Sequence, residues 1–402
     1  MKDTVRLLVV GVAWPMETFL ERLMRSLAMT GFQITLATET RPDQNRLDET
    51  GIQWLSAPLW RGRSLRTLGR LTFNSVRSFF TAPKISAFFW KSTSSCIRWR
   101  DRLASWYSLI PYTRPRWDVI YFPWNISAIN HLPLFELGMP VVISCRGSQI
   151  LIAPHNPRRV DALSGLRMIF DKAAAVHCVS EDILRQASLL GLNSEKAQVI
   201  FSAVDTRFFY PSETSHREGK PFHIVTTGSI NWVKGFEYAL LAVRQLKDLG
   251  LCVRFEIIGD GPDRDRMLFT IRDLDLEDCT DLAGRLEPVQ VREHLKQADV
   301  FLLSSLSEGL SNAALEAMAC GLPVVTTDCG GMREAINDGV EGFVVPVRSP
   351  AALAEKLALL AKDANLRFGM GRAGRERVVH DFNLKDQIQL FHNLLIEAKC
   401  RV

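Results

Sequence analysis

Short apolar runs and amphipathic stretches alternate along most of the chain. Residues 5–11 and 32–37 are apolar runs of strand length, and the apolar positions between them fall close to helical spacing from about Met16 to Gly31. Strand, helix and strand in this order predict a parallel, doubly wound sheet. Further strands are expected at 117–122, 140–144, 173–179, 198–200 and 203–205, with a helix at 180–190.

The same pattern starts again after a polar, turn-rich segment at 211–220. We interpret that segment as a linker between two α/β domains, each a Rossmann-like doubly wound parallel sheet, at 1–210 and 221–383. A last helix, 384–402, carries a row of apolar side chains. In the second half we expect strands at 222–227, 253–258, 300–304 and 323–327, helices at 236–249 and after residue 311, and a hairpin-like return at 338–346.

Composition narrows the class of protein. The chain has 402 residues, of which 47% are hydrophobic and 23% charged, as in ordinary globular proteins. No apolar run approaches the roughly 18 residues that span a bilayer. Asp3 and the missing small-residue cleavage site disfavour a secretory signal. The turn at 12–18 lacks the Gly-x-Gly-x-x-Gly fingerprint, which disfavours a dinucleotide-binding dehydrogenase.

Cysteine and histidine spacing gives no sign of a metal site. The eight cysteines form no Cys-x-x-Cys pair, and the eight histidines show no ligand spacing. Most of the cysteines lie in apolar contexts, which favours reduced thiols in a cytoplasmic protein. We therefore expect no structural zinc. His177 lies inside an apolar strand, where a core histidine and a catalytic one are both conceivable.

One segment, 59–116, is strongly basic. It holds twelve Lys or Arg residues against Asp101 alone, a local charge of +11 in a chain of +5, so the remainder carries −6. Residues 61–107 suit an anionic membrane surface or a lipid-linked substrate. A solvated insertion is the second interpretation, and no motif supports the third, nucleic acid. The segment's interleaved aromatic residues are Phe73, Phe79, Phe80, Phe88, Phe89, Trp90, Trp99, Trp106 and Tyr107.

The chemistry concentrates between the strands at 300–304 and 323–327. Glu308 lies in the loop, and Glu316 lies on a short helix that is apolar nearly all round. Glu316 is either a structural carboxylate with a local partner or a ligand-binding group at the carboxyl end of a parallel sheet. Two carboxylates beside a helix N-terminus suit a ligand that has both hydroxyls and phosphates. A sugar nucleotide is such a ligand.

Lys234 occupies a comparable position after the strand 222–227. It lies where the strand gives way to a helix, so it could meet a phosphate together with the helix dipole. The alternative is a solvated lysine at a helix start.

These motifs together resemble the GT-B glycosyltransferases, and more closely family 4 of the retaining enzymes. The resemblance spans most of the chain and is strongest in the Glu-x7-Glu spacing of Glu308 and Glu316. The other matching stretches are Lys234-Gly235, Gly259-Asp260-Gly261-Pro262, Cys329-Gly330-Gly331 with Glu334, Ser180-Glu181 and Ala203-Val204-Asp205.

The resemblance implies two domains facing a cleft, with the final helix crossing back onto the first domain. It implies that Glu308 contacts the transferred sugar, Glu316 the ribose, and Lys234 the departing pyrophosphate. The resemblance implies no divalent metal and no cofactor, because cations and helix N-termini stabilise the leaving group and the nucleotide-sugar is itself a substrate. The remaining donor-binding residues would be Gly228, Ser229, Arg285, Leu286, Gly309, Leu310, Ser311 and Asn312.

The chain also departs from the family pattern. Ser229 stands where the family usually has an arginine, and Arg146, Arg285 or Arg333 could replace that charge. The glycine-rich first turn is replaced by a turn that contains Trp14 and Glu17. The family's His/Arg-Gly-x-Asp turn ends here in Gln149 instead of the acid. We expect Trp14, Glu17 and Arg146 on the acceptor side.

The expected function is a retaining transfer from a nucleotide-sugar to a glycan or lipid-linked acceptor, in cell-surface polysaccharide or glycolipid assembly. The expected location is the cytoplasm, at the inner face of the membrane if the basic segment binds it. Three alternatives remain: a glycoside hydrolase, a non-catalytic assembly partner of the same fold, and a nucleotide-sugar epimerase. The hydrolase has no use for Lys234, and an epimerase needs its own acid and base.

Overall fold

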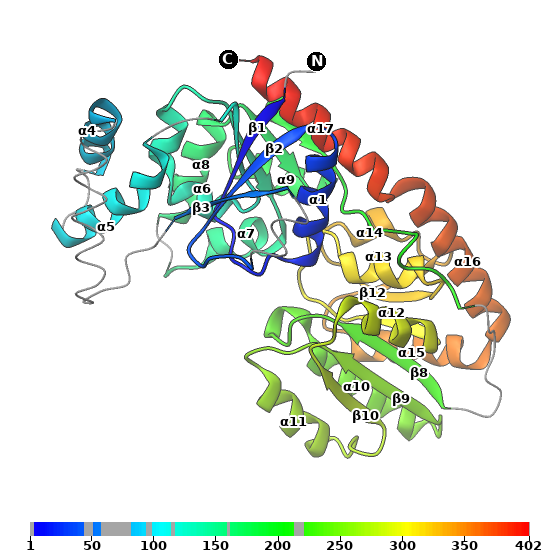
Figure 1. Cartoon of the computed structure of the whole chain (residues 1–402). Coiled ribbons are helices and arrows are strands. Elements are labelled where there is room, and N and C mark those ends of the chain that lie inside the picture. The colour runs from blue at the N-terminus through cyan, green and yellow to red at the C-terminus, as the bar shows by residue number, and fades with distance from the viewer. Residues whose placement is uncertain are drawn as a thin grey trace. The chain divides into compact units, whose positions relative to one another are not determined.

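The computed structural model describes residues 4–43, 51–57, 82–93, 99–113, 117–158, 161–212 and 221–401. The chain divides into two compact units (Figure 1). The first comprises Met1–Cys178, Gln186–Gln198 and Ile388–Val402, and the second comprises Val179–Arg185 and Val199–Gln387. Most of the linker expected at 211–220 and much of the basic segment lie outside the described residues.

The first unit is built on a seven-stranded sheet in the order β3-β2-β1-β4-β5-β6-β7. Its central strands are buried almost throughout, as expected where helices cover both faces of a parallel sheet. The strands are β1 (Val5–Val10), β2 (Phe32–Thr38), β3 (Gln53–Ser56), β4 (Val119–Phe122), β5 (Val141–Cys145), β6 (Ala175–Cys178) and β7 (Ala197–Val199).

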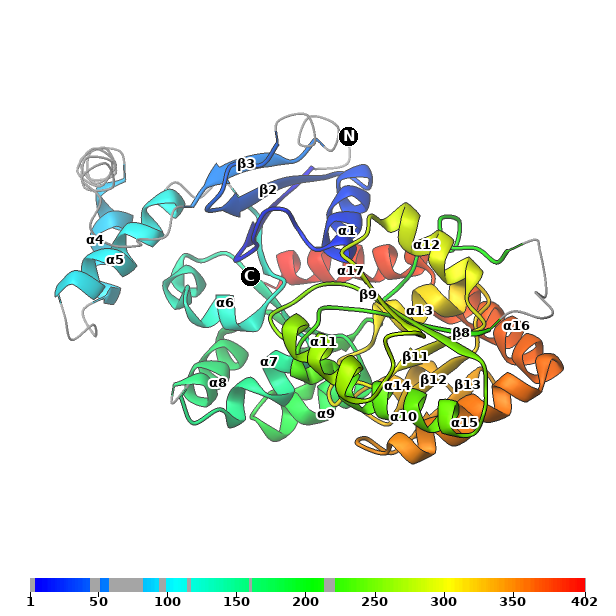
Figure 2. The ribbon, with the colours of Figure 1, turned by 90° about the horizontal axis from the view of Figure 1, so that it is seen from below.

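The helices of this unit begin with α1 (Thr18–Met29), which starts two residues later than the periodicity predicts because Glu17 is still extended, with φ −64° and ψ 139°. Helices α4 and α5 form within the basic segment and lie outside the layer of α6 and α8 (Figures 1 and 2). The remaining helices are α4 (Pro83–Ser92), α5 (Trp99–Leu109), η2 (Ile110–Tyr112), α6 (Asn125–Ile129), η3 (Leu132–Glu136), α7 (Gly147–Leu151), η4 (Ala153–His155), α8 (Ala162–Lys172), α9 (Glu181–Leu189) and η5 (Ser194–Lys196).

The last helix, α17 (Leu384–Cys400), completes the core of the first unit. The ring of Phe391 lies 6.2 Å from that of Tyr121 on β4 and 4.6 Å from that of His177 on β6. His177 is 1% exposed, and its Nδ1 lies 2.7 Å from Ser144 Oγ. His177 is therefore a hydrogen-bonded core residue, the first of the two possibilities left by the sequence.

The second unit contains a six-stranded sheet in the order β10-β9-β8-β11-β12-β13. Helices α10, α11 and α15 cover one face, and α12 and α13 the other (Figure 2). Its strands are β8 (Phe222–Thr227), β9 (Val253–Ile258), β10 (Thr280–Gly284), β11 (Val300–Leu303), β12 (Val324–Thr327) and β13 (Gly342–Val345). Its helices are η6 (Trp232–Lys234), α10 (Phe236–Asp248), α11 (Arg264–Asp273), α12 (Pro288–Gln297), α13 (Asn312–Ala319), α14 (Met332–Ala335), α15 (Pro350–Lys362) and α16 (Ala364–Asp381).

The segment after the Gly-Gly turn differs from its prediction. A hairpin-like return was expected at 338–346, but β13 runs parallel to β12, with Val324 opposite Gly342 and Thr327 opposite Val345. The connection between β12 and β13 is short because its helix, α14, has only four residues, about one helical turn. The chain therefore returns quickly to the edge of the sheet where its strands begin. The sequence pattern alone did not distinguish a short parallel crossover from a hairpin.

Strand β9 of this sheet contains a buried carboxylate, Glu256, which is 2% exposed. Its Oε2 lies 3.0 Å from Nδ1 of His294 and 3.4 Å from Nε2 of His223. Burial acts to raise the pKa of Glu256, but the hydrogen bonds from the two histidines outweigh it and lower the pKa to about 2.

We predict that Glu256→Gln destabilises the protein by about 2–3 kcal/mol at pH 7. Because the pKa of Glu256 is lower in the folded state, its contribution to stability is complete above the unfolded pKa of about 4.5 and is lost as the pH falls toward 2. The difference in the free energy of unfolding between the two proteins should thus shrink between pH 5 and pH 3. Asp281→Asn is the matched control, since Asp281 is an exposed partner of Arg254 on the same sheet. A pH-independent difference for Glu256→Gln contradicts the assignment.

Candidate functional site

The predicted donor-binding residues of the second unit lie at the carboxyl ends of its strands. They occupy the loops after β8, β10 and β11, and the order of strands reverses between β8 and β11. In open α/β sheets, ligands bind at the carboxyl edge beside such a switch point. Sequence and topology therefore identify the same edge.

Lys234 and Glu308 meet at this edge, although 74 residues separate them. Lys234 Nζ lies 2.6 Å from Glu308 Oε1, and Ser305 Oγ donates to the same oxygen at 2.6 Å. The Lys234 side chain is 24% exposed and the Glu308 side chain 11%. This ion pair is partly buried but still reaches solvent. Either side chain can therefore leave the other and contact a hydroxyl or a phosphate of an incoming ligand.

Two glycines allow the loops around this pair to touch. A Cβ on Gly330, which has φ +56°, would lie 1.8 Å from the carbonyl oxygen of Glu308. A Cβ on Gly259, which has φ +147°, would lie 1.9 Å from the carbonyl oxygen of Gly228. Both positions require glycine for its positive φ and its missing side chain. At both glycines the close approach is therefore to the backbone of a neighbouring loop.

Helix α13 begins where the Glu308 loop ends. Its N-cap is Ser311, whose side chain accepts a hydrogen bond from the N–H of Ala314, and Gly321 follows its end with φ +79°. Glu316 is half-buried on this helix. Its carboxylate is therefore not fully removed from water, and it can still contact a ligand. The loop residues Gly309, Leu310 and Asn312 lie directly before or at the start of this helix.

The structure separates the three arginines proposed to replace the missing charge at Ser229. Arg333 pairs with Asp328 at 2.8 Å. Arg146 belongs to the first unit. Arg285 is exposed just after β10, next to the half-buried Leu286, and makes no hydrogen bond or ion pair within the described ranges. Among these three arginines, Arg285 is therefore the one that lies in the second unit and has a charge free to meet a ligand.

The predicted acceptor-side residues also lie at a switch point, where β1 and β4 of the first sheet meet. The guanidinium of Arg146 lies 4.5 Å from the ring of Phe19 and 5.8 Å from that of Trp124. Desolvation raises the pKa of Glu17, and the charge of Arg146 acts in the opposite direction. Trp14, half-buried on the same turn, precedes Glu17.

Sequence reasoning missed Phe19 and Trp124 as partners of Arg146. Trp124 stands two residues after a predicted strand, and an aromatic residue at a strand end was an available signal. Gln149, where the family has an acid, accepts a hydrogen bond from the N–H of Ile126 at 3.2 Å and so has a structural role.

Glu334, quoted above with the Gly-Gly turn, caps a helix. Its carboxylate accepts hydrogen bonds from the N–H groups of Glu181 and Asp182 at 2.7 and 2.8 Å, at the start of α9. Carboxylates are stabilising at a helix N-terminus. Two of the quoted stretches, Ser180-Glu181 and Glu334, are thus in direct contact and serve the fold.

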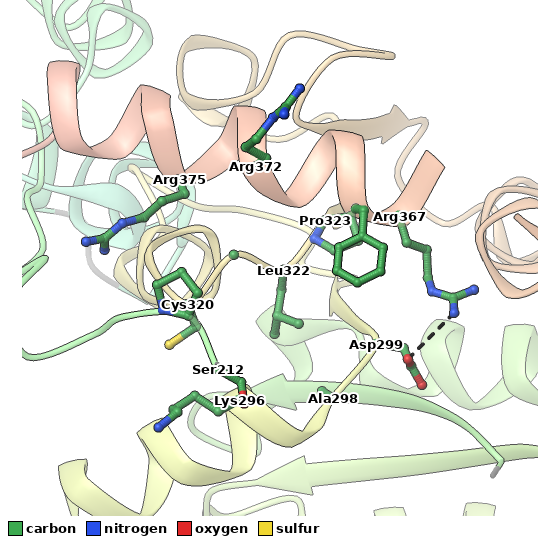
Figure 3. Close-up of a pocket in the computed structure, with 13 residues that line it drawn as sticks. Ser212, Lys296, Ala298, Asp299, Cys320, Leu322, Pro323, Arg367, Arg372 and Arg375 are labelled. Atoms are coloured by element: carbon green, nitrogen blue, oxygen red, sulfur yellow. Dashed lines mark ion pairs between the residues drawn. The ribbon is translucent and has the colours of Figure 1, made fainter. Parts of the chain in front are cut away.

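A pocket of about 320 Å³ lies at the opposite edge of the second sheet, where β11 and β12 begin. Figure 3 shows an apolar centre around Leu322 and Pro323, with cationic side chains that point apart. Arg367 reaches toward Asp299, 3.9 Å away, and Arg375 donates to the backbone carbonyls of three residues, Thr206, Phe209 and Ala319. These cations do not converge on one point, so the pocket lacks the geometry of a phosphate site.

The described residues contain neither a candidate metal site nor a membrane-spanning helix. No group of three or more His, Cys, Asp or Glu side chains there is arranged to hold a metal ion. In the same part of the chain, no helix has the length and hydropathy needed to cross a membrane.

Two family models match the chain and together cover most of it. The model described as "Glycosyl transferase 4-like domain" matches residues 16–201, and "Glycosyl transferases group 1" matches residues 211–377. The first match includes Glu17 and Arg146, and the second includes Lys234 and Glu308.

Curated relatives agree with these models. The chain is 34% identical over 201 residues to the putative colanic acid biosynthesis glycosyltransferase WcaL of Escherichia coli, covering 48% of this chain and 49% of the relative. It is 35% identical over 170 residues to the amylovoran biosynthesis glycosyltransferase AmsK of Erwinia amylovora, covering 41% and 42%. The chain thus matches about half the length of these relatives. It is 30% identical to the D-inositol 3-phosphate glycosyltransferase of Paenarthrobacter aurescens, covering 64% of this chain and 67% of the relative.

Solved structures share the fold at low sequence identity. HepE of Anabaena in complex with UDP is 16% identical, with a TM-score of 0.72 over 98% of this chain and 100% of that one. The sucrose-phosphate synthase of Thermosynechococcus elongatus is 16% identical, with a TM-score of 0.75 over 99% and 100%. With two parallel Rossmann-like sheets, and with group 1 and 4-like models matched on successive halves, the chain belongs to the GT-B glycosyltransferases of the glycosyl transferases group 1 family.

Proposed function

We propose that the chain is a retaining glycosyltransferase that moves a sugar from a nucleotide-sugar to a glycan or lipid-linked acceptor in the assembly of a cell-surface polysaccharide or glycolipid. The observation that carries the proposal is the Lys234–Glu308 pair at the carboxyl edge of the second sheet. The polysaccharide role is supported by the printed names of WcaL and AmsK, colanic acid and amylovoran glycosyltransferases.

The donor belongs at the edge that holds this pair. HepE is described in complexes with UDP and with UDP-glucose, and this supports a nucleotide-sugar donor here. Glu316 would bind the ribose hydroxyls, and the base would lie near Arg285 and Leu286. The backbone amides of 309–312 would face the sugar and the phosphates at the start of α13.

The transfer itself needs charge stabilisation more than covalent chemistry. The bond between the anomeric carbon and the phosphate oxygen breaks, and the acceptor oxygen bonds to the same face of that carbon. The acceptor proton passes to the departing phosphate oxygen. Glu308 would orient the sugar hydroxyls, while Lys234 and Arg285 would stabilise the negative charge that develops on the phosphate. No divalent metal is needed for this step.

The acceptor would be bound by the first unit. Arg146, with Phe19 on one side, offers a fixed cation, and Glu17 is a carboxylate whose raised pKa favours hydrogen bonding to hydroxyls. Trp14 and Trp124 supply apolar ring surface at the same strand ends. Together these groups suit a sugar acceptor with an anionic neighbour such as a lipid-linked phosphate.

The test is an incorporation assay with UDP-, GDP-, ADP- and dTDP-sugars, with and without a membrane extract, and with and without EDTA. We expect sugar incorporation that survives EDTA and is lost in Glu308→Gln. Release of free sugar alone favours a hydrolase, and interconversion of the donor sugar favours an epimerase. Failure to bind or consume any donor leaves the non-catalytic assembly partner and overturns the transferase.

The anomeric configuration of the product tests the retaining mechanism separately. Nuclear magnetic resonance of the new glycosidic linkage should show the configuration of the donor. An inverted linkage overturns the proposed mechanism but not the transferase.

Residues 61–107 form the proposed contact with an anionic membrane surface at the inner face of the membrane. Within them, Trp99 is 69% exposed, and the exposed Lys84 and Lys91 lie on α4. Burial of an indole ring and attraction of each cation to anionic lipid favour the bound state, each lysine by about 1 kcal/mol.

We predict that Trp99→Ser/Lys84→Glu/Lys91→Glu lowers co-sedimentation with liposomes containing phosphatidylserine by about tenfold or more. Neutral liposomes measure the background, and Lys362→Glu, at the exposed last residue of α15, is the charge control. Equal binding of the triple variant and the wild type rules out this surface as the membrane contact.

A further inference from the structure

The first unit holds a second pocket, of about 450 Å³, at the edge where its strands begin. Its floor is one face of the sheet, because Gln33 is opposite Arg6 in the register, and Thr35 is opposite Gln53. Directly paired residues point to the same side. Trp54 and Leu55 of β3, Pro111 of η2, and Trp117 just before β4 complete the lining. Glu17 and Arg146 lie beyond the other ends of these strands, so this pocket is separate from the acceptor side.

The pocket offers hydrogen-bonding groups without an uncompensated charge. Gln33 and Gln53 are exposed, and within the described part of the chain neither side-chain amide has a hydrogen-bond partner. The one cation, Arg6, binds both carboxylate oxygens of Asp118, at 2.8 and 3.4 Å. A phosphate would therefore have to displace an existing ion pair, which disfavours nucleotides and other anions.

Trp117 adds an apolar surface beside the amides. It is half-buried, and its indole N–H has no acceptor in the residues that the structure describes. Trp54 also lines the pocket, but its indole N–H is committed, because Nε1 donates to Thr38 Oγ1 at 3.0 Å. The pocket thus combines aromatic residues with uncommitted amide groups, and its volume is within the range of small-molecule sites, about 300–1,000 Å³.

This chemistry matches a neutral sugar. A pyranose presents C–H groups to an aromatic ring and hydroxyls that both donate and accept, which a glutamine amide can satisfy in either direction. We propose that this pocket binds a neutral segment of a glycan, at a site distinct from the one where transfer takes place. That this glycan is the enzyme's own acceptor chain rests on the proposed function. The binding of a neutral glycan in this pocket does not depend on the proposed function.

A glycan held at both sites would gain in effective concentration. Once a distal segment of the glycan occupies this pocket, the acceptor end of the same glycan is confined near the protein. Each later encounter of that end with the transfer site is then intramolecular. The pocket would then favour long acceptors over short ones.

Saturation-transfer nuclear magnetic resonance of the full chain with neutral hexasaccharides of glucose, galactose and mannose tests the proposal, in the absence of any donor. We expect at least one of them to bind, and Gln33→Ala/Gln53→Ala to raise its dissociation constant about tenfold or more. Gln389→Ala, an exposed glutamine on α17 of the same unit, is the matched control and should bind as the wild type does. UDP binding should be unchanged in both variants.

A heparin hexasaccharide separates this pocket from the basic segment. It can bind to the exposed cations, but its affinity should not change in Gln33→Ala/Gln53→Ala, because Arg6, the cation among the described lining residues, is already paired with Asp118. The proposal is overturned if none of the neutral hexasaccharides binds, or if the double variant binds them as tightly as the wild type. Glycan binding without sugar transfer would contradict the proposed function and leave this site standing.

Discussion

Lys234→Ala should lower kcat for sugar transfer by about 100- to 1,000-fold, with a much smaller effect on the dissociation constant of the nucleotide-sugar. Lys234 Nζ lies 2.6 Å from Glu308 and can turn toward a departing phosphate, whose charge is greater in the transition state than in the bound donor. The loss should therefore appear mainly in kcat. Single-turnover transfer and equilibrium binding of the donor measure the two quantities separately.

Lys296→Ala is the matched control for this experiment. Lys296 lines the pocket at the opposite edge of the same sheet and pairs with Glu293 at 3.5 Å. Its removal should leave kcat within about twofold of the wild type, since it lies beyond the amino ends of the strands. If both lysine variants lose activity equally, the effect is general and Lys234 has no special part in stabilising the leaving group.

Gly330→Ala should lower the rate of transfer by about 100-fold while leaving most of the fold in place. The new Cβ would lie 1.8 Å from the carbonyl oxygen of Glu308, at a residue with φ +56°. Relief requires the Glu308 loop to move, and a displacement of about 1 Å at a positioning residue costs on the order of 100-fold in rate. Strain of this kind also costs roughly 1–3 kcal/mol of stability.

Gly369→Ala is the control that separates the effect of moving the Glu308 loop from the effect of adding a methyl group to the protein. Gly369 lies on α16, and a Cβ there meets no atom within 4 Å, so this change should preserve activity and slightly stabilise the helix. Circular dichroism and donor binding identify folded Gly330→Ala protein before its activity is measured. Normal turnover by folded Gly330→Ala contradicts the close packing of the two loops.

The repeated units of strand and helix were predictable from the sequence because buried parallel strands are continuous apolar runs. The edge strand β3 was not, since only Trp54 and Leu55 of its four residues are apolar. Short edge strands depend on pairing with a neighbour more than on their own composition. The parallel direction of β13 also depends on pairing, because nothing local in 338–346 reveals which strand it joins.

The candidate site shows the same division between local and long-range information. The spacing of Glu308 and Glu316 placed one residue on a loop and the other on a helix, because local signals define the ends of α13. The contact between Lys234 and Glu308 bridges 74 residues and follows from the adjacency of β8 and β11 in the sheet. The capping of α9 by Glu334 spans about twice that separation and had no sequence signal of its own.

The position of Phe391 on α17 has a consequence for biosynthesis. Tyr121 and His177, which it covers, leave the ribosome more than 200 residues earlier, and Ile388–Val402 belong to the same compact unit as they do. The first unit therefore cannot complete its core until synthesis of the second has finished. A nascent chain stalled before residue 388 should expose this sheet face to chaperones, and a fragment ending at residue 210 should be aggregation-prone. Fusing 388–402 to such a fragment should restore its solubility.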